Sequence, residues 1–518
     1  MQRLFFFTSL VMSGIISSSA IAGDSTGAPQ FSVDIDVLVQ TGTPSPDGNG
    51  VFANVISPPI LNNQSQALIW SNLVATDDPG TLDDNGFFRL TRTDRISLVR
   101  GGAAVDNGGA LNLSIQLLTQ QLGRFAQQGL ADDGSMYFVI PDSQTVFRYF
   151  RADGNTLETQ LTSGQSTSFV DELLLFSQLF LLNDIGRPHF VTAIPEFTSG
   201  IIEELGPRLL LTPGQSLPDG REAVAVALGV APLTSRLNNL NQKVLPVQTV
   251  GPFPNNVGLY RTDGVEVLPL LHLGEAAVDG LGTYANQVGA ATVSEGGAAL
   301  IAQFVDDFST DYLGLFFHDG SSLMELARTG TVSDGPNTIT NISNGLQLNS
   351  NNTAAFHASV VDEFGSQRPT VLAYRNGTIE SVIAEFEQLP SPIGLETRGP
   401  LSFALNELGQ IIISGFVIAE GVSRRAIFFH DPQFGLALVA RAGMPLGGSV
   451  VSNLDIALPL NSNQGNTHNS NATNGINDLG EVAFSFTLEN GQVGAAIATV
   501  EFVRSDALFA DRFEGPAR

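Results

Sequence analysis

Short apolar runs separated by polar turns recur along most of the chain. Residues 284–328 show the pattern most clearly, with apolar stretches at 284–293, 298–305, 313–318 and 323–328. Between them lie Ser294-Glu295-Gly296-Gly297, an acidic loop at 306–311, and Asp319-Gly320. Runs of this length, bounded by turn residues, predict four short β-strands joined by hairpins. Asp319-Gly320 predicts a type I′ turn, because both residues tolerate positive φ.

A turn phrase of the type Leu-Asn-x-x-Gly, followed by an apolar strand, recurs eight times at intervals of about 50 to 70 residues, a length typical of propeller blades or solenoid units. Its second position falls at residues 62, 131, 183, 238, 294, 349, 406 and 477. An Asn side chain can bond its own backbone two residues on, and Gly or Asn can adopt the left-handed conformation that closes the hairpin. We therefore interpret the phrase as a turn signature. Asn241 and Asn352 replace its Gly conservatively, whereas Ser65 and Ala131 fit it less well.

A second phrase, an apolar pair followed by Gly, marks the last strand of the repeats. An extra copy lies at the N-terminus, in residues 37–42, whereas the final repeat, residues 472–502, supplies three strands and lacks it. This circular offset predicts that the N-terminal strand completes the last sheet and closes a ring. We predict an all-β fold, an eight-bladed β-propeller over residues 23–503, with an open solenoid or two separate β domains as alternatives. Residues 111–128, apolar at near-helical spacing, predict a short helix on one face.

The N-terminus has the pattern of an export signal. Arg3 is followed by an apolar run, residues 4–16, and then by small residues that end in the Ala-x-Ala pattern Ala20-Ile21-Ala22, which predicts a secretory signal peptide in residues 1–22 rather than a membrane anchor. No later segment has the run of about 18 apolar residues that a membrane-spanning helix needs. Residues 504–518 are expected to form a C-terminal tail. We therefore expect a bacterial protein that is secreted, periplasmic or displayed on the cell surface.

Charge and composition narrow the class of partner. The chain carries a formal net charge of −27, with 43% apolar and 14% charged residues and no cysteine. Such a charge repels nucleic acid and anionic membranes, and the apolar fraction favours a packed globular protein over a disordered acidic one. We expect a monomer without disulfides that has no nucleic-acid partner, and a glycan or an envelope protein as its partner.

The turn phrases and the signal peptide together resemble a family of secreted bacterial proteins. The phrase Asn-x-x-Gly-x-x-x-Phe is clearest at residues 477–484, and residues 507–514 are similar to a short C-terminal ending found in many secreted proteobacterial proteins, with Arg512 at its usual Gly position. The family is that of the uncharacterised proteins with tandem NxxGxxxF repeats and varied C-terminal anchoring signals. The resemblance covers residues 30–503 and implies a propeller-like repeat protein, without implying a biochemical activity.

Familiar catalytic and metal-binding motifs are absent from the sequence. The six histidines have no metal-ligand spacing, no Gly-x-Ser-x-Gly elbow occurs, and the single lysine, Lys243, follows Gln242 rather than the Gly of a phosphate-binding loop. Acidic loops such as Asp77-Asp78 could hold calcium but lack the alternating layout of an EF-hand. We expect no cofactor and no metal, with calcium as the weaker alternative.

One set of basic residues recurs at the end of the third strand, each after an aromatic residue. Its members are Arg89, Arg148, Arg261, His318, Arg375 and His430. Equivalent positions in a ring lie at one radius on one face, so these residues predict a cationic annulus that could bind an acidic polysaccharide through arginine forks. The alternative is that they pair with or stack on the neighbouring blade and serve packing.

Two functions remain open at this point. The first is a non-enzymatic extracellular or cell-surface protein that binds an unknown ligand. The second is a carbohydrate-active hydrolase or lyase with its site at the propeller channel. A propeller can support either function. The sequence favours the binding protein, because its irregularly placed histidines fall in different repeats and form no recognisable catalytic set, whereas sequence spacing cannot locate paired carboxylates contributed by different blades.

Overall fold

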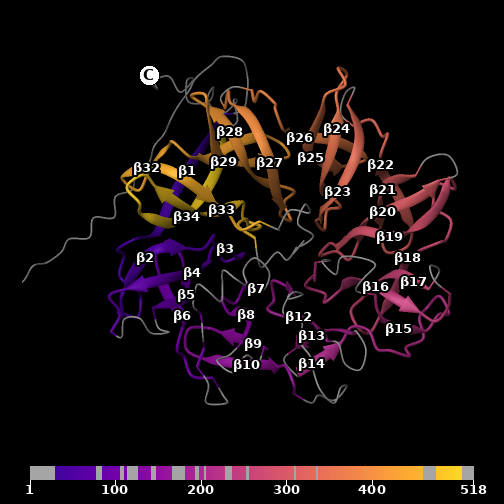
Figure 1. The fold of residues 1–518 in the computed structure, drawn as a ribbon, viewed down its shortest axis with the longest axis horizontal. Helices are drawn as coiled ribbons and strands as arrows, with labels where there is room; N and C mark the ends of the chain where they lie inside the picture. The colour runs from indigo at the N-terminus through magenta and orange to yellow at the C-terminus, as the bar shows by residue number, and fades with distance from the viewer. Residues whose placement is uncertain are drawn as a thin grey trace, which may run out of the picture.

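The strands surround a central axis in a computed structural model of the chain (Figure 1). The structure describes residues 30–77, 84–105, 110–111, 113, 127–141, 147–165, 181–192, 198–203, 206–227, 236–252, 256–307, 311–333, 337–390, 393–458 and 474–503. All regular elements in these ranges are β-strands, so the all-β prediction is confirmed, and the arrangement is a β-propeller. None of the described residues belongs to a helix that could cross a membrane.

Two predictions fall wholly or largely outside the described ranges. The signal peptide, residues 1–22, and the tail, residues 504–518, are not described. The helix predicted for residues 111–128 also lies mostly outside them, but its last two residues belong to strand β7.

The first half of the chain forms antiparallel sheets whose strands mostly follow in sequence order. One contains β2 (Val51–Ile56), β4 (Ala67–Val74), β5 (Asn85–Leu90) and β6 (Arg95–Arg100), with β3 (Ile60–Leu61) paired to β4. The next contains β7 (Gln127–Leu130), β8 (Met136–Pro141), β9 (Phe147–Ala152) and β10 (Leu157–Thr162). Then follow β11 (Leu181–Leu182), β12 (Pro188–Thr192), β13 (Thr198–Glu203) and β14 (Gly206–Leu209), and then β15 (Ala223–Val226), β16 (Lys243–Thr249), β17 (Val257–Thr262) and β18 (Val267–His272).

The second half repeats this order with longer strands. Its sheets are β19 (Gly282–Val293), β20 (Ala299–Asp307), β21 (Tyr312–His318) and β22 (Leu323–Arg328); β23 (Thr338–Leu348), β24 (Ala354–Val361), β25 (Gln367–Arg375) and β26 (Thr378–Ala384); and β27 (Glu396–Leu405), β28 (Ile411–Ala419), β29 (Val422–Asp431) and β30 (Gly435–Arg441). The last sheet contains β31 (Pro445–Leu446), β32 (Ser449–Asp455), β33 (Glu481–Leu488), β34 (Val493–Val503) and β1 (Gln30–Gln40).

The N-terminal strand pairs with the C-terminal strand. β1 runs antiparallel to β34 from Gln30 opposite Val503 to Gln40 opposite Gly494, with a bulge near Val37. The side chains of Leu38 and Val39 are 2% exposed. The N-terminal strand therefore lies in the last sheet, as the offset of the second phrase predicts.

The strands predicted for residues 284–328 agree with β19 to β22 within two residues at each end. The predicted type I′ turn at Asp319-Gly320 is wrong, because only Gly320 has positive φ, at 105°. Asp319 Oδ1 instead accepts hydrogen bonds from the main-chain nitrogens of Ser321 and Ser322, which forms a longer Asx-type connection. The expected left-handed residues are confirmed, with φ of 62° at Asn241 and 60° at Asn352.

The hydrophobic core lies between neighbouring sheets. Phe87 of β5 packs against Phe138 of β8 with ring centroids 5.6 Å apart, and Phe138 stacks on Phe150 within its own sheet. A similar cluster joins Leu38 and Ile497 of the last sheet to Phe52 of the first. Each sheet thus buries both faces, which explains why its strands are almost continuously apolar.

Candidate functional site

Three arginines of the predicted annulus lie at the contacts between sheets. They donate to the main-chain carbonyl oxygen of the motif glycine in the following sheet: Arg89 Nη1 to Gly134 at 2.6 Å, Arg261 Nη1 to Gly297, and Arg375 Nη2 to Gly409 at 2.8 Å. A guanidinium that satisfies a turn carbonyl has fewer donors left for a ligand. For these three arginines the geometry favours the packing alternative.

The other members of the annulus differ from these arginines and from one another. Arg148 is 8% exposed and donates to Thr162 Oγ1 of its own sheet at 3.1 Å. His318 Nδ1 accepts from Gly320 N at 3.0 Å, and burial lowers the pKa of His318. Burial, together with the positive charge of Arg375, lowers the pKa of His430 to about 4, so that this ring is neutral at physiological pH. A ligand-binding role for the six residues stays a prediction.

The motif asparagines make two kinds of hydrogen bond, of which the sequence indicates only one. Within its own turn, Asn62 Oδ1 accepts from the main-chain nitrogens of Gln64 and Gln66, both at 3.0 Å. The Nδ2 atoms reach the carbonyl oxygen of the equivalent residue in the next sheet: Asn62 to Ala131 (2.8 Å), Asn183 to Asn238 (3.1 Å), Asn238 to Ser294 (2.8 Å), Asn349 to Asn406 (3.2 Å), Asn406 to Asn477 (2.9 Å) and Asn477 to Asn62 (3.1 Å). We call this set the asparagine ladder.

The residues that directly follow the motif position form a second set of contacts between sheets, beside the asparagine ladder, and we call this set the central polar ring. Its members are Asn63, Asp132, Asp184, Asn239, Glu295, Ser350, Glu407 and Asp478. Main-chain nitrogens of the ring donate to the side chain of the next member, as from Asn239 to Glu295 Oε2 at 2.7 Å and from Glu407 to Asp478 Oδ1 at 2.9 Å. The ladder and the polar ring bring five carboxyl groups from separate repeats around the axis.

Arg236 provides a positive charge to this ring. Its side chain is 7% exposed and pairs with Glu295 Oε1 through Nη2 and with Glu407 Oε1 through Nη1, the latter at 3.2 Å. Its Nη1 also donates to the carbonyl oxygen of Leu348 at 3.3 Å. The guanidinium lies between acidic residues of two different sheets and compensates part of their charge.

Burial perturbs three carboxyl groups of the central polar ring. It raises the pKa of Asp184 to about 7, although the charge of Arg236 acts in the opposite direction. Burial also raises the pKa of Asp478 and of Glu295 above their ordinary values. Desolvation that disfavours the charged form is the usual cause of such shifts. Asp184 is thus poised to exchange a proton near neutral pH.

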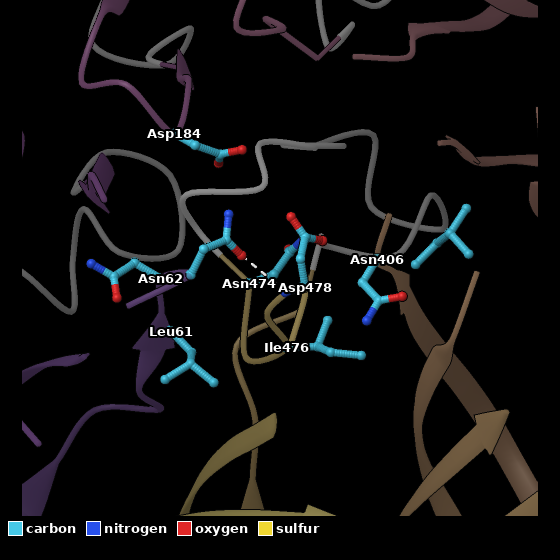
Figure 2. Close-up of a pocket in the computed structure, with 9 residues that line it drawn as sticks. Leu61, Asn62, Asp184, Asn406, Asn474, Ile476 and Asp478 are labelled. Atoms are coloured by element: carbon cyan, nitrogen blue, oxygen red, sulfur yellow. Dashed lines mark hydrogen bonds between the residues drawn. The ribbon is translucent and has the colours of Figure 1, made fainter. Parts of the chain in front are cut away.

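A small cavity opens between these residues at the ring centre (Figure 2). Asp184 approaches it from one side, and Asn474 and Asp478 lie on the other. Asn474 is 4% exposed, and its Oδ1 atom has no hydrogen-bond partner within the described part of the chain. Its main-chain carbonyl accepts from Leu61 N at 2.7 Å, which fixes the backbone of Asn474 beside β3. A buried amide oxygen without a partner is costly and indicates a site that a ligand or water can complete.

The chemistry of the site is that of hydrogen-bond acceptors. Among the described residues, no three His, Asp or Glu side chains are grouped so that they could hold a metal ion. The cavity therefore offers carboxylate and amide oxygens without a metal-binding cluster. It can accept hydrogen bonds and positive charge, and Asp184 can give or take a proton.

Sequence reasoning missed most of this site. Aligning the residue after each motif position would have shown the acidic character of the central polar ring, because five of its eight members are Asp or Glu. Arg236 and Asn474 precede the motif phrase and belong to no repeated pattern, so only the fold brings them to the axis.

The chain aligns with several solved structures at low sequence identity and low TM-score. A polysaccharide lyase of family PL25, an ulvan lyase, aligns at 8% identity and a TM-score of 0.31 over 72% of this chain and 93% of its own. The BP39L lectin from Burkholderia pseudomallei aligns at 11% identity and a TM-score of 0.32 over 74% of this chain and 98% of its own. PorZ, a surface component of the type-IX secretion system of Porphyromonas gingivalis, aligns at 10% identity and a TM-score of 0.30 over 77% of this chain and 60% of its own. Likeness at this level carries no inference about ligand or activity.

No curated protein matches the chain. A protein family does match it, over residues 150–503, which is more than half of its length. The chain therefore belongs to DUF7453, a family of unknown function.

Proposed function

We propose that this protein is a secreted or cell-surface binding protein of a bacterium, built as a closed eight-bladed propeller that holds its ligand at the ring centre. The observation that carries the proposal is the cavity beside Asp184 and Asp478, where the buried Asn474 Oδ1 lacks a partner among the described residues. The proposed location follows from the signal peptide expected in residues 1–22.

The blade number and the closure rest on several contacts between the two ends of the chain. The described strands form eight sheets. β1 pairs with β34, and Asn477 Nδ2 donates to Asn62 O across 415 sequence positions. Arg92 pairs with both Asp36 and Glu481, so the first and last sheets also share ion pairs. These contacts support a ring in which the last blade completes the circle with the N-terminal strand.

The uneven chemistry of the ring centre supports a binding role. Most ladder and turn contacts recur from sheet to sheet, as expected of groups that every blade needs to pack. Arg236, which pairs with Glu295 and Glu407 of the central polar ring, and Asn474, which lines the cavity, break this symmetry. A concave site with a few convergent polar groups is the usual form of a ligand pocket. Its proposed partner is a glycan or an envelope protein.

The test is binding by the labelled full-length protein to a glycan array and to bacterial envelope fractions. The double variant Asp184→Asn, Asp478→Asn removes the two cavity carboxylates, and the control Asp306→Asn removes one carboxylate from an exposed position at the end of β20. We expect a ligand that binds the wild type and Asp306→Asn but not the double variant. Equal binding by all three proteins would place the site elsewhere, and no retained ligand would contradict the binding role.

A second candidate function is a carbohydrate-active hydrolase or lyase with its site in the same cavity. The specific observation in its favour is the pKa of Asp184, raised by burial to about 7, since a carboxyl group protonated near neutral pH can act as a general acid. Release of reducing ends or unsaturated sugars from a polysaccharide, lost in Asp184→Asn and retained in Asp306→Asn, would favour the enzyme over the binding protein.

A further inference from the structure

We propose that the cavity at the ring centre binds the primary ammonium group of an alkylamine, with the alkyl chain lying against the aliphatic side chains that follow the cavity carboxylates. This inference rests on the proposed function, because it assigns a ligand class to the same site. It commits to a ligand that donates hydrogen bonds from a positively charged nitrogen and carries an apolar chain.

The cavity has free acceptors. Asn474, a residue 4% exposed whose Oδ1 has no hydrogen-bond partner among the described residues, lines the cavity together with Asp184 and Asp478. Asp184 accepts one side-chain hydrogen bond, from Asn239 Nδ2 at 3.3 Å, and Asp478 accepts one from Glu407 N. A carboxylate has about four lone-pair sites, so both retain capacity for a donor.

Three of the four side-chain amide groups in the cavity lining, those of Asn62, Asn63 and Asn406, already donate to other groups of the protein. Asn62 Nδ2 donates to Gln66 Oε1 and to the carbonyl oxygen of Ala131, and Asn63 Nδ2 donates to Asp132 Oδ2 at 3.3 Å. Asn406 Nδ2 likewise donates to Gln410 Oε1 and to the carbonyl oxygen of Asn477. A ligand that needs donors from the protein is therefore disfavoured, and one that supplies them is favoured.

The charge of the site also favours a ligand with a positively charged nitrogen. Arg236 pairs with Glu295 and Glu407, whereas Asp184 and Asp478 form no ion pair within the part of the chain that the structure describes. Burial raises the pKa of both carboxyl groups although the charge of Arg236 partly opposes it, and a bound ammonium would relieve more of the desolvation cost. Charge-assisted hydrogen bonds to an ammonium are about twice as strong as neutral ones.

The surroundings favour an alkylammonium over a bare metal ion. The described residues hold no group of three acidic or histidine side chains suited to a metal. Instead, each cavity carboxylate is followed by an exposed aliphatic residue, Ile185 at 52% and Leu479 at 60%. Leu240 and Leu408, both 55% exposed, occupy the same position in two further turns. These four side chains are not part of the cavity lining, but each directly follows a member of the central polar ring in the sequence, and they are the proposed contacts of the alkyl chain.

Two sources share this chemistry, a free amine and the lysine side chain of a partner. Isothermal titration with n-hexylamine tests the free amine, and the neutral n-hexanol tests the alkyl chain alone. The peptide acetyl-Leu-Lys-Leu-amide, compared with its norleucine analogue, tests the lysine side chain. We expect saturable binding of hexylamine or of the lysine peptide, and binding at least ~10-fold weaker for the neutral analogue.

Variants locate the site. Asp184→Asn and Asp478→Asn should each weaken binding of the amine about 10-fold or more, and Asn474→Ala, which keeps the charge, should weaken it several-fold. Asp306→Asn, with the same change of charge at an exposed position, should bind as the wild type does. Circular dichroism of each variant verifies that a loss of binding does not arise from unfolding.

Three results would overturn the ammonium assignment: no binding of either cationic probe, equal affinity for n-hexanol and n-hexylamine, or unchanged affinity in both Asp184→Asn and Asn474→Ala. These results leave the proposed function standing if a glycan or envelope ligand still depends on the cavity carboxylates. Failure of the ligand class and failure of the binding role are thus separate outcomes.

Discussion

Asn477 Nδ2 lies 3.1 Å from the carbonyl oxygen of Asn62 and donates a hydrogen bond to it, although the two residues are 415 positions apart. Both side chains are almost fully buried, at 3% exposure. The same geometry joins Asn406 to Asn477 within one half of the chain. The contact between the ends of the repeat array is therefore chemically equivalent to a contact between consecutive repeats.

Replacing Asn477 by Ala tests this equivalence. The change removes a buried donor and leaves the Asn62 carbonyl without this partner, so we expect the free energy of unfolding to fall by about 1–3 kcal/mol. Asn406→Ala, at an internal rung, should cost a similar amount, and the exposed Asn490→Ala should cost less than about 0.5 kcal/mol. Urea denaturation measures all three. A cost at Asn477 no larger than at Asn490 would contradict a closed ring.

Deleting residues 23–48 removes β1 from the last sheet. The loss exposes the edge of β34 and the apolar surface that covers Leu38 and Val39, so we expect a decrease in unfolding free energy of at least about 3 kcal/mol. A chain that lacks only residues 23–29 keeps β1 complete and serves as the control. Identical melting temperatures for the two deletions would show that β1 does not complete the ring.

The strand positions were predictable because their signals are local. In residues 284–328 the apolar runs and the turn residues that bound them mark β19 to β22 to within two residues at each end. The place of the N-terminal strand was predictable because residues 37–42 carry an extra copy of the second phrase, which the final repeat lacks. Turn geometry was less predictable. The Asp319 side chain closes its turn by accepting a main-chain hydrogen bond, and Asp319 does not adopt the positive φ that a type I′ turn needs. At Asn376-Gly377 both residues have positive φ, at 50° and 85°, as a type I′ turn requires.

The ring centre could not be located from spacing alone. Asp184 and Asp478 come from different repeats, and only their shared place in the turn phrase brings them to one cavity. The annulus shows the opposite case. The sequence pattern at Arg89 suggested a ligand site, but in the fold the Arg89 guanidinium donates to a main-chain carbonyl oxygen of the next sheet. At Arg89, Arg261 and Arg375 the recurrent pattern therefore favours packing, whereas a departure from recurrence, as at Arg236, marks the candidate site.

The annulus gives a third prediction. Replacing Arg89 and Arg375 by Ala removes hydrogen bonds to the carbonyl oxygens of Gly134 and Gly409, and we expect the melting temperature to fall. Arg368→Ala removes a more exposed arginine, 37% accessible and paired with Asp362, and should have a small effect. Thermal unfolding measures the difference.

The same double variant tests the ligand-binding alternative. If the arginines serve packing, an acidic polysaccharide should bind neither the wild type nor the variant at moderate salt. Salt-dependent binding by the wild type, lost in a variant of unchanged melting temperature, would instead support the predicted cationic annulus.

The fourth prediction concerns pH and Asp184. Burial raises the pKa of this carboxyl group from 3.8 to about 7 in the folded protein. Between these values the folded state keeps a proton that the unfolded state has released, so the free energy of unfolding falls as the pH rises through this window. Ionisation of Asp184 lowers the free energy of unfolding by about 4 kcal/mol in total, and most of this loss has occurred when the pH reaches about 7. Asp478 and Glu295, whose pKa values burial also raises, act in the same direction.

Asp184→Asn separates the contribution of this residue from theirs. The amide can keep an oxygen toward Asn239 Nδ2 but does not ionise, so the variant should lose part of the decline in stability and be more stable than the wild type at neutral pH. Asp306→Asn should follow the wild-type profile. Urea denaturation from pH about 4 to about 8 provides the comparison. If Asp184→Asn runs parallel to the wild type over this range, the carboxyl group is not held in its neutral form by burial. Addition of an ammonium ligand should reduce the pH-dependent fall in the free energy of unfolding of the wild type, because the bound cation stabilises the ionised carboxylate in the folded state.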